Sequence, residues 1–440
     1  MRYRNDDAAA HIGLSALSDA EWTAHFGRFQ PLPGNLPHPL ALRYHGHQFG
    51  TYNPELGDGR GFLFAQLRGR DGRLFDLGTK GSGQTPHSRF GDGRLTLKGA
   101  VREVLATEML AALGVETSRT FSIIETGEQL HRGDEPSPTR SAVMVRMNHS
   151  HIRIGSFQRL AHLGQGAEME RLLRYTLTHY VGVSAQAAQT MPVDDAAALL
   201  LRFTAKACAR LAASYMVAGF VHGVLNTDNI NVTGESFDYG PWRFTPTWDP
   251  AFVAAYFDHQ GLYSFGRQPQ AIYWNVGQLA IALSSIAQAP GLNAALEEFA
   301  PAYGAAMAER FCWRLGVEQQ SEAADRALVL AAEHFMRATG GAIDAFFADW
   351  AGGRIPPQAT GEATMAADAS AARDALIAAL SGRAATRKRW ANTIPAQSLL
   401  IEEVEALWAP IAERDDWAPL YAKIAAIRAM GAALAAPIIA

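Results

Sequence analysis

One stretch of this 440-residue chain, residues 220–240, restricts the possible folds more than any other. Two apolar residues lead into a polar tip with Asp228 and Asn229, and a Thr-Gly pair then offers a turn before Asp238. We expect a hairpin that returns Asp238 to the neighbourhood of Asn229. An amide and a carboxylate together offer oxygen ligands for a hard divalent cation, and Asp228 is then free to accept a proton. Two surface turns rich in Asn, Asp and Gly are the alternative interpretation.

Composition and charge describe an ordinary globular protein. Hydrophobic residues make up 48% of the chain and charged residues 19%, which excludes a disordered chain. The formal charge of −4 gives no reason to expect a nucleic-acid partner. Cys208 and Cys312 are too few for a disulfide framework and lack zinc-ligand spacing, which favours a reducing compartment. The N-terminus has no apolar signal core, and the charge-free run at 429–440 is too short for a bilayer, so we expect a cytoplasmic protein without a membrane partner.

A hairpin nearer the N-terminus is expected to deliver a lysine. The apolar segment 62–67 and the return segment 74–79 flank an Asp-Gly pair, which is a strong hairpin signal. The return strand ends at Lys80, the first residue of a Lys-Gly-Ser-Gly loop. Glycines let backbone N–H groups approach phosphate oxygens, and Arg60 and Lys80 add positive charge. A short loop of this kind is also common as a plain turn, and this one matches neither a Walker A loop nor a dinucleotide fingerprint.

The next segment predicts a helix over residues 95–113, stopped by Gly114. Its apolar residues form one stripe, and Glu103 lies off that stripe. Two interpretations of Glu103 remain open. It is either a solvated helix charge, which is the usual case, or the partner of Lys80, as the strand lysine and helix glutamate are in protein kinases.

Two further strands are predicted at residues 120–126 and 142–147, and the second ends near Arg146. Arg146 and Arg153 are candidate phosphate ligands, because a guanidinium group donates two parallel hydrogen bonds to phosphate oxygens. His149 and His151 stand two residues apart with no evident third ligand, so a metal site there is disfavoured.

From residue 158 onward the chain is predicted to be mainly helical. A long amphipathic helix over 194–216 ends before Gly219 and leads into the polar stretch described first. A loop is expected at 351–363, and the basic cluster at 383–389 is interpreted as a solvated face. Further helices are expected at 270–288, 293–314 and 321–350. We divide the chain into an N-terminal arm, an N-lobe with glycine-rich nucleotide loops, a helical C-lobe with the catalytic loop and a helical C-terminal extension, at residues 1–40, 41–157, 158–350 and 351–440.

Several longer motifs follow one another in a fixed order along the chain. They are Arg-Tyr-His-Gly-His-Gln-Phe-Gly at 43–50, Leu-Gly-Asp-Gly-Arg at 56–60, the loop at 80–86, Ser-Arg-Phe-Gly-Asp-Gly-Arg at 88–94, Arg-Glu at 102–103, Ser-His-Ile-Arg at 150–153, His-Gly-Val-Leu-Asn-Thr-Asp-Asn at 222–229, Asp-Tyr-Gly-Pro at 238–241 and Asp-Pro at 249–250. Together they resemble the selenoprotein O family of protein adenylyltransferases. The resemblance is firm over residues 40–290 and weakens from about 350 onward. It implies an α+β, protein-kinase-like bilobal fold, with a small mixed β-rich N-lobe and a large, mainly helical C-lobe with a helical extension.

The resemblance implies transfer of AMP from ATP to Ser, Thr or Tyr hydroxyls of proteins, with ATP flipped relative to a kinase. Asp228 is then the base, Asn229 and Asp238 hold Mg²⁺ or Mn²⁺, and Lys80 binds phosphate while paired with Glu103. UMP transfer from UTP is a further possibility. The remaining residues that the resemblance assigns to the nucleotide site are Gly57, Gly59, Arg60, Asp92, Gly93, Arg146, Arg153 and Asp238.

Two other functions fit the same residues. A protein or small-molecule kinase would use the same base, lysine and metal ligands on the γ-phosphate. A silent nucleotide-binding scaffold is less consistent with a sequence in which every chemical role is filled. Unlike many members of the family, the sequence ends in Ala-Pro-Ile-Ile-Ala without a cysteine or selenocysteine tail, and a Cys208–Cys312 bridge is not expected.

Overall fold

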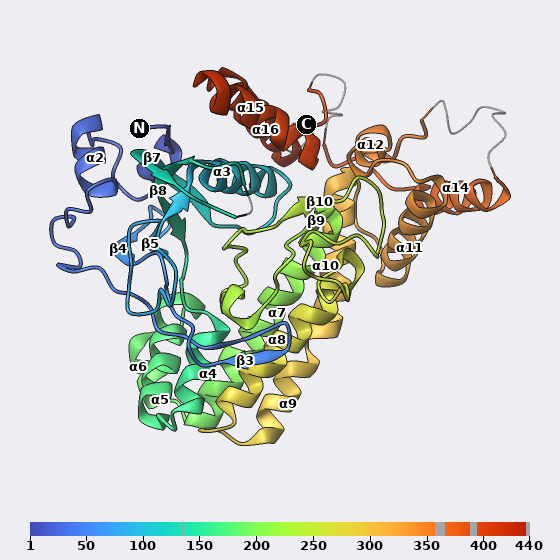
Figure 1. Cartoon of the computed structure of the whole chain (residues 1–440). Helices are drawn as coiled ribbons and strands as arrows, with labels where there is room; N and C mark the ends of the chain where they lie inside the picture. The colour runs from blue at the N-terminus through green and yellow to red at the C-terminus, as the bar shows by residue number, and fades with distance from the viewer. Residues whose placement is uncertain (134, 357–365, 388–393, 437–440) are drawn as a thin grey trace.

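The computed structural model describes residues 1–133, 135–356, 366–387 and 394–436. The main sheet and the helices from the two ends of the chain form one part of the molecule, and the helices of the middle of the chain form the other (Figure 1). Parts of the predicted loop at 351–363 and of the basic cluster at 383–389 lie outside the described residues. Within the described ranges, no helix is long and apolar enough to cross a membrane.

Helices outnumber strands. The α-helices are α1 (Asp6–His11), α2 (Asp19–Phe26), α3 (Leu97–Ala112), α4 (Ile154–His162), α5 (Gly166–Thr176), α6 (Ala185–Thr190), α7 (Val193–Ala218), α8 (Gln268–Leu283), α9 (Ala289–Glu297), α10 (Phe299–Leu315), α11 (Glu322–Thr339), α12 (Ile343–Asp349), α14 (Ala367–Leu380), α15 (Ile401–Arg414) and α16 (Ala418–Ala435). The strands are β1 (Tyr3–Arg4), β2 (Gly46–Gln48), β3 (Thr51–Asn53), β4 (Leu63–Arg68), β5 (Leu74–Lys80), β6 (Leu95–Thr96), β7 (Arg119–Leu130), β8 (Thr139–Asn148), β9 (Phe220–Val221) and β10 (Arg243–Phe244).

The main sheet is antiparallel, with the strand order β1-β7-β8-β5-β4, and β6 also pairs with β8. The predicted hairpin is present as β4 and β5, and its turn places Gly72 at a φ of 79°, where a residue without Cβ is unstrained. Strand β5 ends at Lys80, as the sequence predicts. Because β8 lies beside β5, the backbone of Arg146 pairs with that of Gly78, close to the lysine.

Helix α3 packs against β7 and β8, and α16 crosses its other side (Figure 1). A Cβ atom at Gly431 would lie 2.9 Å from Cα of Ala112, so the small residue permits the close approach of the two helices. Both ends of the described chain meet at Glu108 of α3. Arg428 donates hydrogen bonds of 2.8 Å to its two carboxylate oxygens, and the Tyr3 hydroxyl donates one of 2.7 Å.

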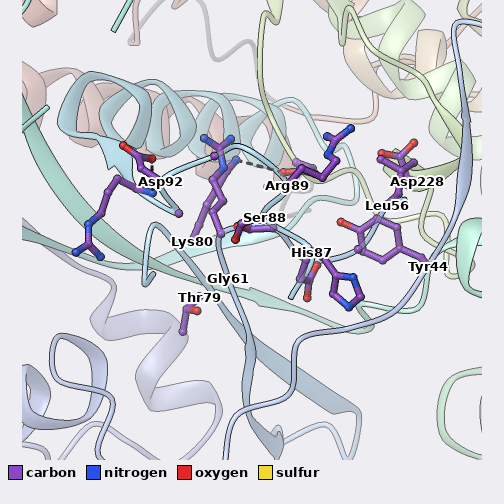
Figure 2. Close-up of a pocket in the computed structure, with 18 of the residues that line it drawn as sticks. Tyr44, Leu56, Gly61, Thr79, Lys80, His87, Ser88, Arg89, Asp92 and Asp228 are labelled. Atoms are coloured by element: carbon purple, nitrogen blue, oxygen red, sulfur yellow. Dashed lines mark hydrogen bonds and ion pairs between the residues drawn. The ribbon is translucent and has the colours of Figure 1, made fainter. Parts of the chain in front are cut away.

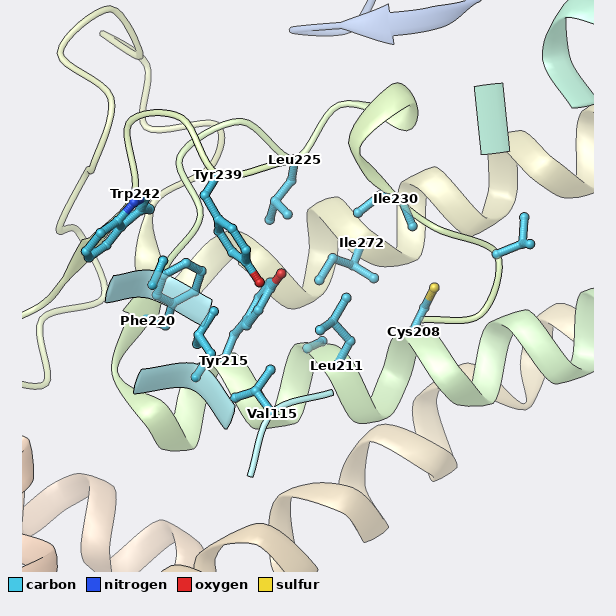
Figure 3. Packing of buried hydrophobic residues seen from close by; sticks show 14 of the residues in the cluster. Val115, Cys208, Leu211, Tyr215, Phe220, Leu225, Ile230, Tyr239, Trp242 and Ile272 are labelled. Carbon is cyan, nitrogen blue, oxygen red and sulfur yellow. The ribbon is translucent and has the colours of Figure 1, made fainter. Parts of the chain in front are cut away.

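The long helix α7 is the centre of the helical part and packs against α8, α9 and α10. It ends at Gly219, which adopts a left-handed conformation with a φ of 70°, as the sequence predicts for this glycine. Tyr215 of α7 packs with Phe220, Tyr239 and Trp242, and these side chains form an aromatic layer (Figure 3). This layer gives residues 220–240 a rigid support.

The prediction that residues 220–240 pair with one another as a hairpin is wrong. The turn at Gly234 is present, with a φ of 73°, but the two arms bond to other segments instead of to each other. The first arm exchanges backbone hydrogen bonds with residues 152–154, and the second with residues 116–118. The stretch is therefore held between two distant parts of the chain.

The prediction that residues 383–389 form a solvated face is wrong for the two arginines at its described end. Arg383 is buried and pairs with Asp325 at 2.6 Å. Arg387 is also buried and donates hydrogen bonds to the carbonyl oxygens of Arg314 and Leu434. The two free cysteines are buried as well, Cys208 on α7 and Cys312 on α10.

Candidate active site

A cavity of about 690 Å³ collects most of the residues that the sequence singled out (Figure 2). Asp92 and Asp228 lie at its opposite ends, with Lys80 between them. Its lining is strongly cationic, because seven Lys or Arg side chains face four Asp side chains. The cations are Arg60, Lys80, Arg89, Arg94, Arg132, Arg146 and Arg153, and the acids are Asp58, Asp92, Asp228 and Asp238.

Lys80 and Glu103 form a buried ion pair. The Lys80 ammonium lies 2.6 Å from a carboxylate oxygen of Glu103, and their side chains are 6% and 1% exposed. The interpretation of Glu103 as the partner of Lys80 is therefore confirmed, and its interpretation as a solvated helix charge is wrong. Glu103 is absent from the cavity wall, but it contacts Lys80, which does line the cavity.

Asp238 lies between two of these cations. One carboxylate oxygen is 3.2 Å from the Lys80 ammonium and 3.1 Å from the Arg146 guanidinium. Burial opposes its ionisation, but the charges of Lys80, Arg146, Arg153 and Arg60 outweigh burial and hold the pKa of Asp238 well below its usual range. Its backbone is left-handed with a φ of 63°, a conformation that Asp and Asn tolerate better than most residues.

Arg153 is the most deeply enclosed cation of the cavity, with 1% exposure. Its guanidinium lies over the rings of Tyr44 and Phe237, at 4.2 and 5.1 Å from their centroids, and 3.2 Å from the Asp58 carboxylate. The side-chain Nε of Arg153 has no hydrogen-bond partner in the described part of the chain. Sequence reasoning missed Asp58, although it stands inside the Gly-Asp-Gly motif whose two glycines were assigned.

Asp228 lies in a short 3-10 turn, Thr227–Asn229, at one end of the cavity. It is 8% exposed, and its Oδ1 is buried without a hydrogen-bond partner among the described residues. Burial raises the pKa of Asp228 to about 7, against the lowering effect of its own backbone N–H and of Arg153. A carboxylate with this pKa is suited to accept a proton near neutral pH.

The hairpin of β2 and β3 holds the turn that carries Asp228. The backbone N–H of His47 donates to the Thr227 hydroxyl at 2.7 Å, and that of Phe49 donates to the Asn226 side chain at 3.1 Å. The sequence marked residues 43–50 only as part of a resemblance. Its mechanical role was not visible there, because it depends on a contact across about 180 residues.

The other predicted site residues lie along the cavity wall. Gly57, Gly59, Arg60 and Gly93 line it, and a Cβ atom at Gly57 would come within 2.4 Å of the His87 ring, so only glycine fits there. Asp92 lines the wall too, but its carboxylate is paired with Arg132 at 2.9 Å.

Three cavity cations, Arg89, Arg94 and Arg132, were not predicted as site residues. The first two stand in the Ser-Arg-Phe-Gly-Asp-Gly-Arg motif at 88–94, which was a usable signal.

The two predicted metal ligands, Asn229 and Asp238, both carry oxygen donor atoms. Asn229 donates its amide N–H to the Val224 carbonyl at 2.9 Å, which leaves its amide oxygen for another partner. Asp238 adds carboxylate oxygens at the cavity wall, whereas Asn229 is not among the residues that line the cavity. This is an oxygen donor set of the kind that Mg²⁺ or Mn²⁺ takes when substrate phosphates complete the coordination, so the residues fit such an ion. No cluster of three or more His, Cys, Asp or Glu residues arranged to hold a metal alone occurs within the described ranges.

A cationic cavity that ends at a buried carboxylate with a pKa near 7 is typical of enzymes that transfer phosphate-containing groups. The family model described as Protein adenylyltransferase SelO matches residues 1–428. The chain belongs to this family, and as a member it is a nucleotidyltransferase.

Three relatives named protein nucleotidyltransferase YdiU illustrate the similarity. The relative from Gloeobacter violaceus is 43% identical over 97% of this chain and 89% of its own length, and that from Trichormus variabilis is 41% identical over 98% and 91%. The relative from Synechocystis sp. is 51% identical over 72% of this chain, and the aligned part spans 65% of that relative.

Proposed function

We propose that the protein transfers AMP from ATP to Ser, Thr or Tyr hydroxyls of other proteins, with release of pyrophosphate. The observation that carries this proposal is the position of Asp228. It is a buried carboxylate with a pKa of about 7 at one end of a cavity whose remaining wall is rich in Lys and Arg. Such a wall suits the negative charge of a nucleoside triphosphate, and the carboxylate suits the activation of a hydroxyl.

In the proposed reaction Asp228 takes the proton of the acceptor hydroxyl. The hydroxyl oxygen bonds to the α-phosphorus, and the bond from that phosphorus to the oxygen bridging to the β-phosphate breaks. Lys80, Arg146 and Arg153 stabilise the charge that collects on the departing pyrophosphate. Glu103 keeps the Lys80 ammonium in position through their 2.6 Å contact.

A divalent ion, Mg²⁺ or Mn²⁺, belongs to this proposal. Asn229 and Asp238 would hold it, and its chemistry would be to neutralise phosphate oxygens during transfer. In this role Asp238 would give up part of its contact with Lys80 and Arg146. We also propose that the sheet with α3 and the helical part around α7 correspond to the two lobes of a protein-kinase-like fold, with the nucleotide between them.

The test uses ATP labelled at the α- or the γ-phosphate, with Mg²⁺ or Mn²⁺ and a mixture of candidate proteins. Label on protein from the α-position alone is the expected result. Transfer from the γ-position alone would show a kinase, and ATP binding without transfer would show a scaffold. UTP labelled at the α-phosphate, run in parallel, measures the choice between AMP and UMP. Asp228→Ala is expected to abolish transfer while ATP still binds, because Asp228 contributes to proton removal and little to the charge of the nucleotide site.

A further inference from the structure

A second cavity, of about 490 Å³, opens beside the first and has no role in the proposed reaction. Leu56, His87, Arg89 and Phe90 border both cavities. One residue of the second cavity adjoins a glycine that contacts Asp228. His45 lines the second cavity, and the next residue, Gly46, is so close to Asp228 that an added Cβ would lie 2.9 Å from its Oδ1.

The nucleotide does not need this second space. The first cavity, at about 690 Å³, falls inside the range of about 300–1,000 Å³ that holds a whole small ligand. It also contains Arg60, Lys80, Arg146 and Arg153, which are sufficient partners for a triphosphate without Arg89. The acceptor protein, in contrast, must bring its hydroxyl to Asp228 from outside, and the second cavity offers a space that adjoins the first.

The charges of the second cavity favour an anion. Arg89 and Arg159 line it, against one carboxylate, that of Glu55. In the described ranges neither guanidinium group has an ion pair or a side-chain hydrogen bond, whereas Arg94 and Arg132 nearby are both paired with acids. The two histidines of the wall are not the source of this preference, because their surroundings disfavour the protonated, cationic form. Burial, with the neighbouring charges of His162 and Arg159, lowers the pKa of His45 to about 4, and burial lowers the pKa of His87.

The loop that carries Arg89 is held against the wall of the first cavity. The hydroxyl groups of Thr85 and Ser88 each donate to a backbone carbonyl at 2.5 Å, those of Asp58 and Gly59. Arg89 itself is exposed and has a left-handed backbone with a φ of 51°. A long side chain held in this sparsely populated conformation indicates a position set by function, since such conformations persist only where their surroundings enforce them.

We propose that the second cavity is the docking site for an acidic side chain of the acceptor protein, close to the hydroxyl that receives the nucleotide. This inference rests on the proposed function. Arg89 and Arg159 bind the carboxylate of an Asp or Glu, and the contact sets the acceptor segment beside Asp228. The enzyme therefore selects hydroxyl residues in acidic surroundings.

The experiment uses two peptide pools built around a fixed serine, one with glutamate and one with lysine at the flanking positions, and ATP labelled at the α-phosphate. The wild-type protein is expected to label the glutamate pool about tenfold faster than the lysine pool. Arg159→Gln is expected to remove the difference, and Arg159→Glu to reverse it. Neither should change KM for ATP, because Arg159 lines only the second cavity. Arg326→Glu, an exposed change on α11, is the matched control and should keep the wild-type preference.

Equal labelling of the two pools by the wild-type protein would overturn the inference and leave the proposed function intact. A higher KM for ATP in Arg159→Glu with the glutamate preference retained would also overturn it, because the cavity would then serve the nucleotide. Failure of the proposed function looks different, since neither the peptide pools nor whole proteins would acquire label from the α-position.

Discussion

Gly46 stands against the carboxylate of Asp228 so closely that a Cβ atom would lie 2.9 Å from its Oδ1 and 3.0 Å from the hydroxyl of Thr227. Both neighbours are buried, so neither can move away freely. The proton acceptor of the proposed reaction is therefore positioned by a backbone from another part of the chain as well as by its own turn.

Replacing Gly46 by alanine should therefore lower kcat by about tenfold or more while leaving KM for ATP nearly unchanged, because a small displacement of a catalytic group is costly and the nucleotide wall is not touched. Steady-state kinetics with labelled ATP would measure both constants. Gly277→Ala on α8 is the control, since an added Cβ there meets nothing within 4 Å. Equal losses in the two variants would show that Gly46 has no special relation to Asp228.

Asp228→Asn should stabilise the protein at alkaline pH. The pKa of Asp228 in the folded state, about 7, lies above the ordinary value of 3.8. The free energy of unfolding therefore falls as the pH rises from about 4 to about 7, and the loss is complete above pH 7. The shift corresponds to at most about 4 kcal/mol. In urea unfolding of the metal-free protein, the variant should thus have a higher free energy of unfolding than the wild type at pH 8 and nearly the same value at pH 4. A difference independent of pH would contradict the raised pKa.

The Lys80–Glu103 pair should show strong coupling in a double-mutant cycle. Lys80→Met leaves the buried Glu103 without this partner, and Glu103→Gln leaves Lys80 with Asp238 alone. Each single change is expected to cost up to about 3–5 kcal/mol, whereas the double variant removes both charges of the pair. The double variant should be destabilised by less than the sum of the single ones. The exposed pair Lys98–Glu405, 2.7 Å apart, is the control, with an expected coupling below about 1 kcal/mol. Additive losses at Lys80 and Glu103 would contradict the buried pair.

Asp238→Asn separates charge from backbone shape, because Asn also tolerates the left-handed conformation at this position. Without metal, removal of an anion from a cationic wall should strengthen ATP binding severalfold. With Mg²⁺ present, the gain in affinity and activity that the ion gives to the wild type should largely disappear. Calorimetry with and without Mg²⁺ measures both effects. If Mg²⁺ stimulates the variant as much as the wild type, Asp238 is not a metal ligand.

Local patterns predicted the parts of the site that short segments determine. The Asp-Gly turn defined the hairpin that ends at Lys80, and Gly219 defined the end of α7. Both are signals carried by a few neighbouring residues, and both were confirmed. The pairing of Glu103 could be framed as one of two possibilities, because helix periodicity shows which face carries the residue but not what lies opposite.

The rest depends on contacts that no local pattern contains. The sequence on either side of Gly234 predicted a hairpin, but its two arms form their backbone hydrogen bonds with residues 152–154 and 116–118 instead of with each other. Arg383 looked solvated because its partner, Asp325, is 58 residues away. The contact of Gly46 with Asp228 and the pairing of Asp92 with Arg132 likewise become visible only when distant segments are brought together.

The meeting of Tyr3, Glu108 and Arg428 has a consequence for synthesis of the protein. Arg428 is made 320 residues after the glutamate that it contacts on α3. A ribosome therefore completes the sheet, the cavity wall and Asp228 before α3 acquires its cover. Helix α3 also carries Glu103, the partner of Lys80. A product terminated before α16 therefore holds this glutamate on a helix that lacks its packing against α16. Prematurely ended chains are thus expected to be poorly active.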